Sequence, residues 1–312
     1  MNTTATIGLR PLRATDGEAV AAIDRALSGR PRGAFFARRL AQLAREPASF
    51  AAFAAERDGA LAGFVLARLY EGEFGAERRE AALDAIGVAA AGEGVGHALL
   101  GHLVEGLRAQ GVAALTTEVD WRERGLLGFF AHHGFELAPR LVLARPILGA
   151  VPHEDTFADA EARDRVPVRS MTRADLPALV AIDRRITGRN RGAYFARKMD
   201  EAMEESAVRV SLVAERDGHP AGFVMARVAF GEFGQAEPEA AMDTIGVDPQ
   251  RAHQGLARAL LSQLLVNLGA LRVETLRTEV AWNRFGLLAF LERSGFGPHR
   301  RLALERPLGA AG

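Results

Sequence analysis

The sequence predicts an α/β protein made of two tandem modules, each a mixed, mostly antiparallel sheet flanked by helices. Three observations support this fold class. The chain of 312 residues repeats itself at a nearly constant shift. Each copy carries the element order βααβββαβαβ, and each contains a hairpin section followed by a strand, a turn, a helix and a strand. Such an order gives a mixed sheet with helices on both faces.

The repeat is visible in short matching segments. Ile-Asp-Arg at residues 23–25 recurs at 182–184, a shift of 159 residues (182 − 23). Further along the chain the second copy has two extra residues in one turn, so the shift becomes 161 (279 − 118) and Glu118 matches Glu279. The matches show which positions both copies kept.

The repeat also places the domain boundaries. The first module is expected at residues 1–148 and the second at 165–312. The segment 149–164 is acidic and has no clear period, so it is interpreted as a linker.

Composition excludes several classes of function. Lys and Arg number 39 and Asp and Glu number 39, so no net charge points to nucleic acid or to an anionic membrane. The absence of Cys excludes disulfides, thiolate nucleophiles and thiolate metal sites. The first residues lack the basic and apolar regions of a signal peptide, and no apolar run is long enough to cross a bilayer. We expect a cytoplasmic monomer or homodimer.

The second copy shows the elements most clearly. The alternating segment 166–170 predicts a strand, and Asp175 can cap a helix that tolerates Pro177 in its first turn and ends at Gly188. The remaining elements follow from periodicity: strands at 208–214, 220–228, 242–247, 273–280 and 301–305, and helices at 194–204, from 258, and at 285–293.

The turn after the strand 242–247 is the most informative stretch. Gly255 and Ala257 let the backbone approach a bulky ligand, and free amides at a helix N-terminus bind anions such as phosphates. The turn lacks the Gly-Lys-Ser/Thr end of a Walker loop and the Gly-x-Gly-x-x-Gly fingerprint of dinucleotide-binding folds. An ordinary βα turn that only needs small residues is the alternative.

Residues 252–257, Ala-His-Gln-Gly-Leu-Ala, resemble the pyrophosphate loop of GCN5-related N-acetyltransferases, Gln/Arg-x-x-Gly-x-Gly/Ala, with Ala in its first position. The segment 288–296, Leu-Ala-Phe-Leu-Glu-Arg-Ser-Gly-Phe, resembles a second signature of that family. The likeness covers both halves except the linker. In the second half it is nearest to the subgroup that acetylates the N-terminal alanine of a ribosomal protein.

The resemblance implies two acetyltransferase-fold modules and an acetyl-CoA-dependent transfer to a primary amine by direct attack in a ternary complex. The acceptor would be a small molecule or a peptide. The residues expected to bind coenzyme A lie in the second module, namely Ile245, Gly246, Val247, His253, Gln254, Gly255, Leu256, Ala257, Arg258 and Asn283.

Amine acetylation needs a base, because an ammonium group cannot attack a thioester. Glu279 holds the position where the resembling subgroup carries its base. The alternative is a solvent-facing strand carboxylate paired with Arg277 or another Arg. Asp243 is the second candidate, and it could instead bond loop amides at a strand start.

Arg189 and Arg191 lie on the loop that the family uses to cover the acceptor, and could meet a carboxylate or a phosphate of the substrate. A solvated basic loop is the alternative. The eight His residues show no metal-ligand spacing, so no metal site is expected.

Two departures from the family pattern stand out. The Tyr that often protonates the leaving thiolate is replaced by Leu291, and by Phe130 in the first copy. The first copy also has a shorter turn with Glu93 where amides should meet phosphate, and a carboxylate there repels a pyrophosphate. We therefore expect a degenerate first site and an active second site. A non-catalytic module that binds acyl-CoA as a sensor or scaffold is the alternative function.

Overall fold

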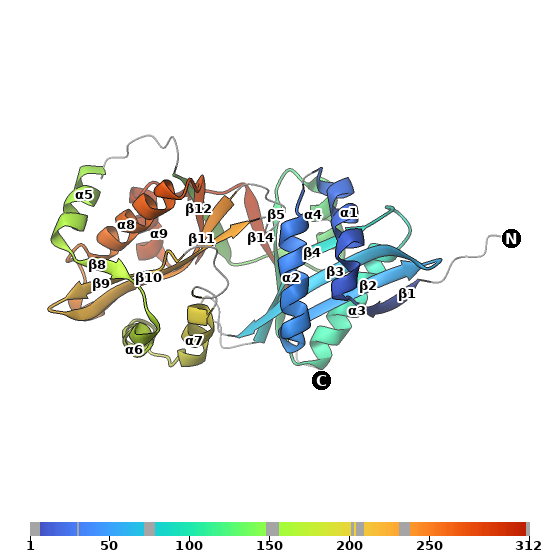
Figure 1. Ribbon diagram of the computed structural model, residues 1–312, viewed down its shortest axis with the longest axis horizontal. Helices are drawn as coiled ribbons and strands as arrows, with labels where there is room; N and C mark the ends of the chain where they lie inside the picture. Colours follow the sequence, from blue (N-terminus) through green and yellow to red (C-terminus); the bar gives the residue numbers. More distant parts are fainter. Residues whose placement is uncertain are drawn as a thin grey trace.

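Two seven-stranded sheets organise the chain, one for each repeat (Figure 1). The computed structural model describes residues 7–29, 31–71, 79–147, 156–200, 203, 209–230 and 238–309. Within these ranges the predicted fold class is confirmed. The pairs β4–β5 and β11–β12 are parallel, and the other strand pairings of the described residues are antiparallel.

The first repeat contributes seven strands and four helices among its described residues. The strands are β1 Gly8–Pro11, β2 Phe50–Arg57, β3 Ala60–Glu71, β4 Arg79–Val88, β5 Ala114–Asp120, β6 Glu136–Leu137 and β7 Arg140–Pro146. The helices are α1 Gly17–Ser28, α2 Gly33–Arg45, α3 Val95–Ala109 and α4 Arg124–His132.

The second repeat carries the same elements as the first, in the predicted order except for one short strand, β13, that was not predicted. Its strands are β8 Val168–Ser170, β9 Leu212–Arg216, β10 His219–Phe230, β11 Pro238–Val247, β12 Thr275–Ala281, β13 Gly297–Pro298 and β14 Arg301–Pro307. Its helices are α6 Leu176–Thr187, α7 Gly192–Asp200, α8 Leu256–Ala270 and α9 Phe285–Arg293. The strand expected at 242–247 begins earlier, at Pro238, because the whole apolar run pairs with β10.

One difference concerns the segment expected as a linker. Residues 148–155 lie outside the described part of the chain, but helix α5, Thr156–Arg165, follows and packs against α8 (Figure 1). A polar segment without a clear period can still form a helix when tertiary contacts support it.

The halves exchange their closing strands. β7 of the first repeat lies between β12 and β13 of the second sheet, and β14 of the second repeat lies between β5 and β6 of the first sheet. Figure 1 shows β14 beside β5 in the half that holds the N-terminal helices. The predicted modules, 1–148 and 165–312, did not include this exchange, because the alternation of a strand shows which face is buried but not which sheet it joins.

Helices cover both faces of each sheet. In the first half, the apolar face of α3 packs on one side through residues such as Leu103, whereas Phe36 of α2 meets Phe64 of β3 on the other side. In the second half, Leu264 of α8 and Phe195 of α7 take the same places. Two packed layers around each sheet give each half a core of its own.

In both sheets the two central strands separate. β11 pairs with β12 only over residues 239–241 and 275–277, and the next residues of the two strands are no longer paired. Asp243 is an extra residue in β11, since Met225 pairs with Thr244 and Ala226 with Met242. The splayed strands open a cleft in which side chains from both can meet.

Candidate active site

The predicted anion-binding turn has the geometry that its sequence indicates. β11 ends at Val247, a short turn follows, and Gly255 caps α8 with φ +79°. Such a left-handed backbone favours Gly, and Gly255 has no side chain with which to cap the first amides of α8. Leu256 is buried in the core, so it can contribute to this turn only through its backbone.

The two repeats differ in charge beside this turn. In the second repeat, Arg216 donates to Gln254 Oε1 at 3.3 Å, and no carboxylate of the described residues pairs with Arg216. In the first repeat the equivalent Arg57 forms an ion pair with Glu93. Of these two equivalent arginines, only Arg216 offers a charge that no described carboxylate neutralises. This arrangement fits a pyrophosphate in the second half and opposes one in the first.

A cavity of about 680 Å³ lies between the splayed strands of the second half. Several predicted site residues line it together: Asp243, Ile245, Gly246, Val247, Glu279, Asn283 and Arg191. The turn residues His253, Gln254, Gly255, Leu256, Ala257 and Arg258 and the loop residue Arg189 do not line it. The turn lies beyond the end of β11, so a ligand that contacted both the turn and the cavity would have to be long.

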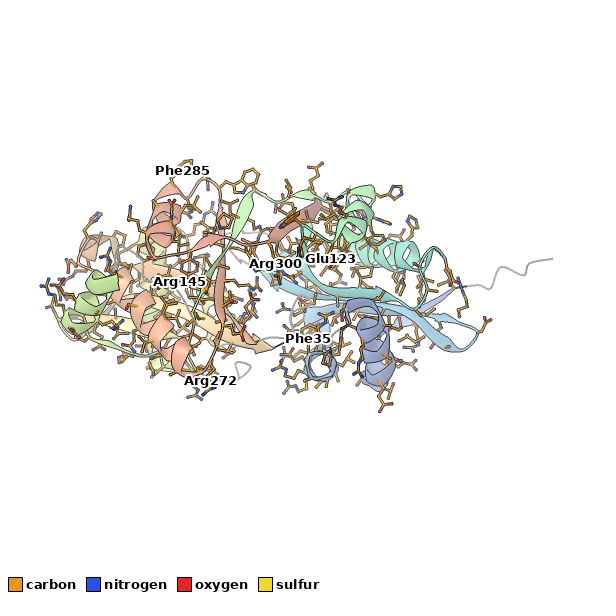
Figure 2. All side chains as sticks on the ribbon, turned by 90° about the horizontal axis from the view of Figure 1, so that it is seen from above. Phe35, Glu123, Arg145, Arg272, Phe285 and Arg300 are labelled. Atoms are coloured by element: carbon orange, nitrogen blue, oxygen red, sulfur yellow. The ribbon has the colours of Figure 1, made fainter. Side chains whose placement is uncertain are left out.

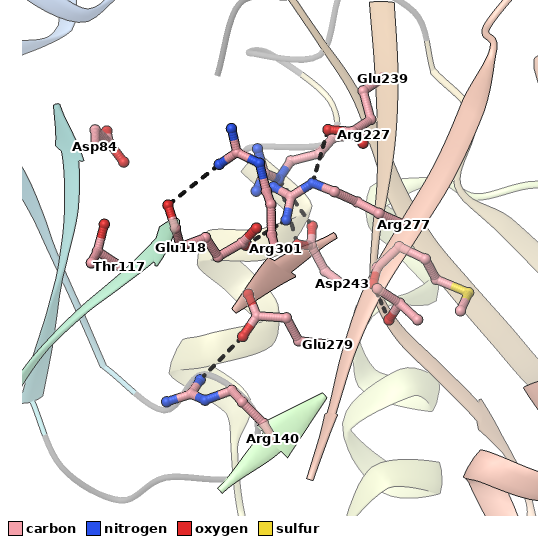
Figure 3. Close-up of polar contacts among 12 residues, drawn as sticks. Asp84, Thr117, Glu118, Arg140, Arg227, Glu239, Asp243, Arg277, Glu279 and Arg301 are labelled. Atoms are coloured by element: carbon pink, nitrogen blue, oxygen red, sulfur yellow. Dashed lines mark hydrogen bonds and ion pairs between the residues drawn. The ribbon is translucent and has the colours of Figure 1, made fainter. Parts of the chain in front are cut away.

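Glu279 lies on β12 and lines this cavity. Its side chain is 16% exposed and its carboxylate lies 3.5 Å from Arg140 of β7 (Figure 3). Burial, together with the charge of Glu118, raises the pKa of Glu279 to about 8, and Arg140 opposes this rise. The alternative for Glu279 is a solvent-facing strand carboxylate paired with Arg277 or another Arg. Its ion-pair partner is indeed another Arg, Arg140, but its side chain is mostly covered, and Arg277 pairs with Glu118 and Glu239.

Asp243 is engaged by two cations. Its carboxylate lies 3.4 Å from Arg227 and 3.7 Å from Lys198, and its side chain is largely covered. In the first repeat Asp84 is held in the same way by Arg68 and Arg39. These contacts are ion pairs across the sheet and to a helix, so the structural role of Asp243 differs from the predicted bonding of loop amides.

The two arginines of the predicted substrate loop behave differently. Arg191 forms an ion pair with Asp183 and lies over the ring of Tyr194, 4.9 Å from its centre. The charge of Arg191 is therefore balanced by Asp183 inside the protein, and Arg191 is also one of the residues that line the cavity. Arg189 is exposed. Substrate binding by either residue stays a prediction.

Sequence reasoning missed two residues that face Glu279 from the first repeat. Arg140 reaches the second site because β7 joins the second sheet, and Glu118 reaches it from β5 of the first sheet, across the junction of the halves (Figure 3). The repeat contained a signal, because Arg140 matches Arg301 at the shift of 161 (301 − 140) and both begin a closing strand. A pair of retained arginines at an apolar strand indicates buried carboxylate partners.

The first half has a cavity of its own, of about 440 Å³, between β4 and β5. Glu118 lines it, as do Arg300 and Glu123, which Figure 2 shows at the junction of the halves. Among the described residues no group of three His, Asp or Glu side chains could hold a metal ion. No helix of the described chain is long and apolar enough to cross a membrane.

The model of the acetyltransferase (GNAT) family matches the chain twice, at residues 19–135 and 177–296. The two matches cover both repeats and most of the chain. No curated protein matches the sequence at a significant level.

Several solved structures share the fold of the whole chain. A tandem GNAT protein from the clavulanic acid biosynthesis pathway is 18% identical, with 98% of this chain and 100% of that chain covered and a TM-score of 0.65. A GCN5-related N-acetyltransferase from Sphaerobacter thermophilus is 16% identical, with 97% and 96% covered and a TM-score of 0.62.

A third structure contains a GCN5-related glucosamine N-acetyltransferase region of a fungal multi-domain β-N-acetylglucosaminidase. It is 16% identical, with a TM-score of 0.69 over 96% of this chain, and this chain spans only 38% of its length. At these identities the likeness concerns the fold.

Proposed function

Because the chain belongs to the GNAT acetyltransferase family, we propose that it transfers the acetyl group of acetyl-CoA to a primary amine in the cleft of its second half. One observation carries the proposal. Glu279 and the strand segment expected to align the pantetheine arm, Ile245–Val247, line the same cavity of about 680 Å³.

The choice of the second half rests on the turn beside Gly255. The first amides of α8, which Gly255 does not cap, and the cation of Arg216 suit the two phosphates of coenzyme A. The ion pair between Arg57 and Glu93 removes the same cation from the first half. When bound, acetyl-CoA supplies an activated thioester, and the protein has to hold it and deprotonate the amine.

Glu279 is proposed as the general base. A lysine-like amine with a pKa near 10.4 is almost wholly protonated at neutral pH, so it cannot attack unaided. A carboxylate whose pKa is raised to about 8 is a stronger base than an exposed one, and a catalytic base works best when its pKa lies near the working pH. The amides of β11 beyond Asp243 would polarise the acetyl carbonyl.

The rival function is acyl-CoA binding without catalysis. The absence of the usual Tyr favours it, because Leu291 at that position is fully buried and offers no proton. Against it stands the placement of a carboxylate of raised pKa in the cleft, which binding alone does not require. Thioester consumption over a panel of amines, from peptides to small metabolites, distinguishes the two functions.

The test of the base is the variant Glu279→Gln. Its turnover should fall by about 10² to 10⁴, the usual contribution of general-base help, while coenzyme A affinity changes little. Part of the rate should return at high pH, where the amine loses its proton unaided. Glu274→Gln, an exposed change just before the same strand, is the matched control. Wild-type turnover in the Glu279→Gln variant would remove Glu279 as the base.

A further inference from the structure

Glu118 on β5 and Glu279 on β12 hold equivalent positions in the two repeats, and both lie at the buried junction of the halves, where each strand pairs with the closing strand of the other repeat (Figure 3). Their carboxyl groups are within hydrogen-bonding reach of one another. Both line a small polar cavity of about 60 Å³ between the halves. From there Glu118 borders the first-half cavity and Glu279 borders the second-half cavity, so this pair connects the two.

The cations around the pair are distributed unequally. Arg277 of the second repeat lies 2.5 Å from Glu118. The equivalent residue of the first repeat is Thr116, which carries no charge, so the symmetric contact to Glu279 is lost. Glu279 has Arg140 at the longer distance of 3.5 Å. When two neighbouring carboxyl groups compete for one proton, it goes to the group with the weaker cationic support, which here is Glu279.

The hydrogen bonding of Glu118 agrees with this placement of the proton. Its Oε1 accepts from Arg277, whereas its Oε2 is buried and meets no hydrogen-bond donor in the described part of the chain. A buried carboxylate oxygen without a donor is costly. A protonated Glu279 within reach supplies the donor that Oε2 lacks.

We propose that Glu118 is a positioning residue for acetyl transfer in the second half, where it accepts a hydrogen bond from protonated Glu279 and so fixes the place at which the released proton is held. This inference rests on the proposed function. In the transfer a nitrogen–carbon bond forms and the carbon–sulfur bond breaks. Of the two protons that the ammonium loses, one ends on the thiol, and the other is held on Glu279 before it leaves to solvent.

The groups that face Glu279 come from both halves. Burial and Glu118 raise the pKa of Glu279, and Arg140 and Arg277 lower it. Removing the charge of Glu118 should therefore lower this pKa, and removing the charge of Arg140 should raise it. The other charged or titratable residues that line the two cavities bordered by Glu279 are Arg68, Tyr70, Asp183, Arg191, Tyr194, Arg227, Asp243 and Arg284.

The experiment measures the pH dependence of kcat for the full-length variants Glu118→Gln and Arg140→Gln. One unit of pKa changes the deprotonated fraction about tenfold on the acid side. In Glu118→Gln the acid limb should move to lower pH, so that at pH about 6.5 the variant keeps about tenfold more of its maximal rate than the wild type. In Arg140→Gln the limb should move to higher pH.

Two controls separate the possible failures. In a Glu279→Gln background, Glu118→Gln should leave the profile unmoved. A second control is the infrared carbonyl band of a protonated carboxyl group, recorded without substrate. The band should be present in the wild type near pH 7 and absent in Glu279→Gln. As pH is raised, it should disappear at a lower pH in Glu118→Gln than in the wild type.

Lower maximal rates with an unmoved limb and an unmoved band would make Glu118 merely structural and overturn the inference. Wild-type turnover in Glu279→Gln would instead overturn the proposed function. If Glu118→Gln does not fold, the test uses Arg140→Gln with the same two measurements, the acid limb of the kcat profile and the infrared carbonyl band.

Discussion

Arg140 lies 3.5 Å from Glu279, although the two residues belong to different repeats. The contact exists because β7 pairs with β12, which sets Val142 opposite Glu279 and Arg140 opposite Ala281. A side chain of the first repeat therefore shapes the electrostatics of the second cleft. The same pairing in the other sheet sets Arg301 opposite Asp120, and its guanidinium donates to the backbone carbonyl of Glu118 at 3.4 Å.

The glycines that cap α8 and α3 give a matched pair of variants for coenzyme A binding. Gly255→Glu should abolish binding through bulk and like charge, whereas Gly94→Glu should leave it intact, because the first turn is already blocked by Glu93. Both glycines have positive φ, so both variants carry the same backbone penalty of about 1–2 kcal/mol.

The measurement is calorimetric titration with coenzyme A, with circular dichroism to verify folding. A Cβ at Gly255 meets nothing closer than Ala162 at 4.0 Å, and one at Gly94 meets nothing within 4 Å, so neither fold should be obstructed. The wild type should show one tight site. Two sites of similar affinity, or binding that survives Gly255→Glu, would contradict the assignment of the site to the second half.

The raised pKa of Glu279 predicts how stability depends on pH. Between about pH 4.5 and 8 the folded chain holds a proton on Glu279 that the unfolded chain has released. The contribution of Glu279 to the free energy of unfolding is therefore full below pH about 4.5 and is lost as pH rises through about 8. Each unit of pKa difference corresponds to about 1.4 kcal/mol. Gln at this position stays neutral, so Glu279→Gln should lose less stability than the wild type between pH 6 and 9.

Melting temperatures recorded across that range provide the measurement, with Glu274→Gln as the control. The pKa of Glu118 is lowered, because the charges of Arg277 and Arg301 outweigh the effect of its burial. The stability that Glu118 contributes is therefore lost as pH falls, so the comparison begins at pH 6, above that range. Parallel curves for Glu279→Gln and the wild type would contradict a neutral Glu279 in the folded protein.

The exchanged strands predict where a core mutation acts. Leu304 belongs to the second repeat but packs in the core of the first half, and its equivalent Leu143 packs in the core of the second half. Leu→Ala at either position should cost about 2–5 kcal/mol. In hydrogen exchange, Leu304→Ala should weaken protection of β3 and β5, and Leu143→Ala that of β10 and β12. The reverse pattern would contradict the sheet order.

The sequence was sufficient for the order of the longer elements of each repeat, since hydrophobic period and turn residues are local signals. It missed helix α5 and the two-residue strands β6 and β13, which have no clear period of their own. It was also sufficient for the turn at Gly255, whose small residues have a local steric cause. The partner of each closing strand could not be predicted in this way, because Arg140–Pro146 and Arg301–Pro307 carry nearly the same pattern and fit either sheet. The contact of Arg140 with Glu279 was missed for that reason.

The exchange of β7 and β14 also limits how the protein can move. Because each half ends inside the other, a hinge that opened the junction would have to break the β7–β12 and β5–β14 ladders together. These two pairings thus hold the two sheets together as one rigid unit. Any closure over a ligand falls to the elements that border the clefts without belonging to the ladders, such as α6, α7 and the start of α9.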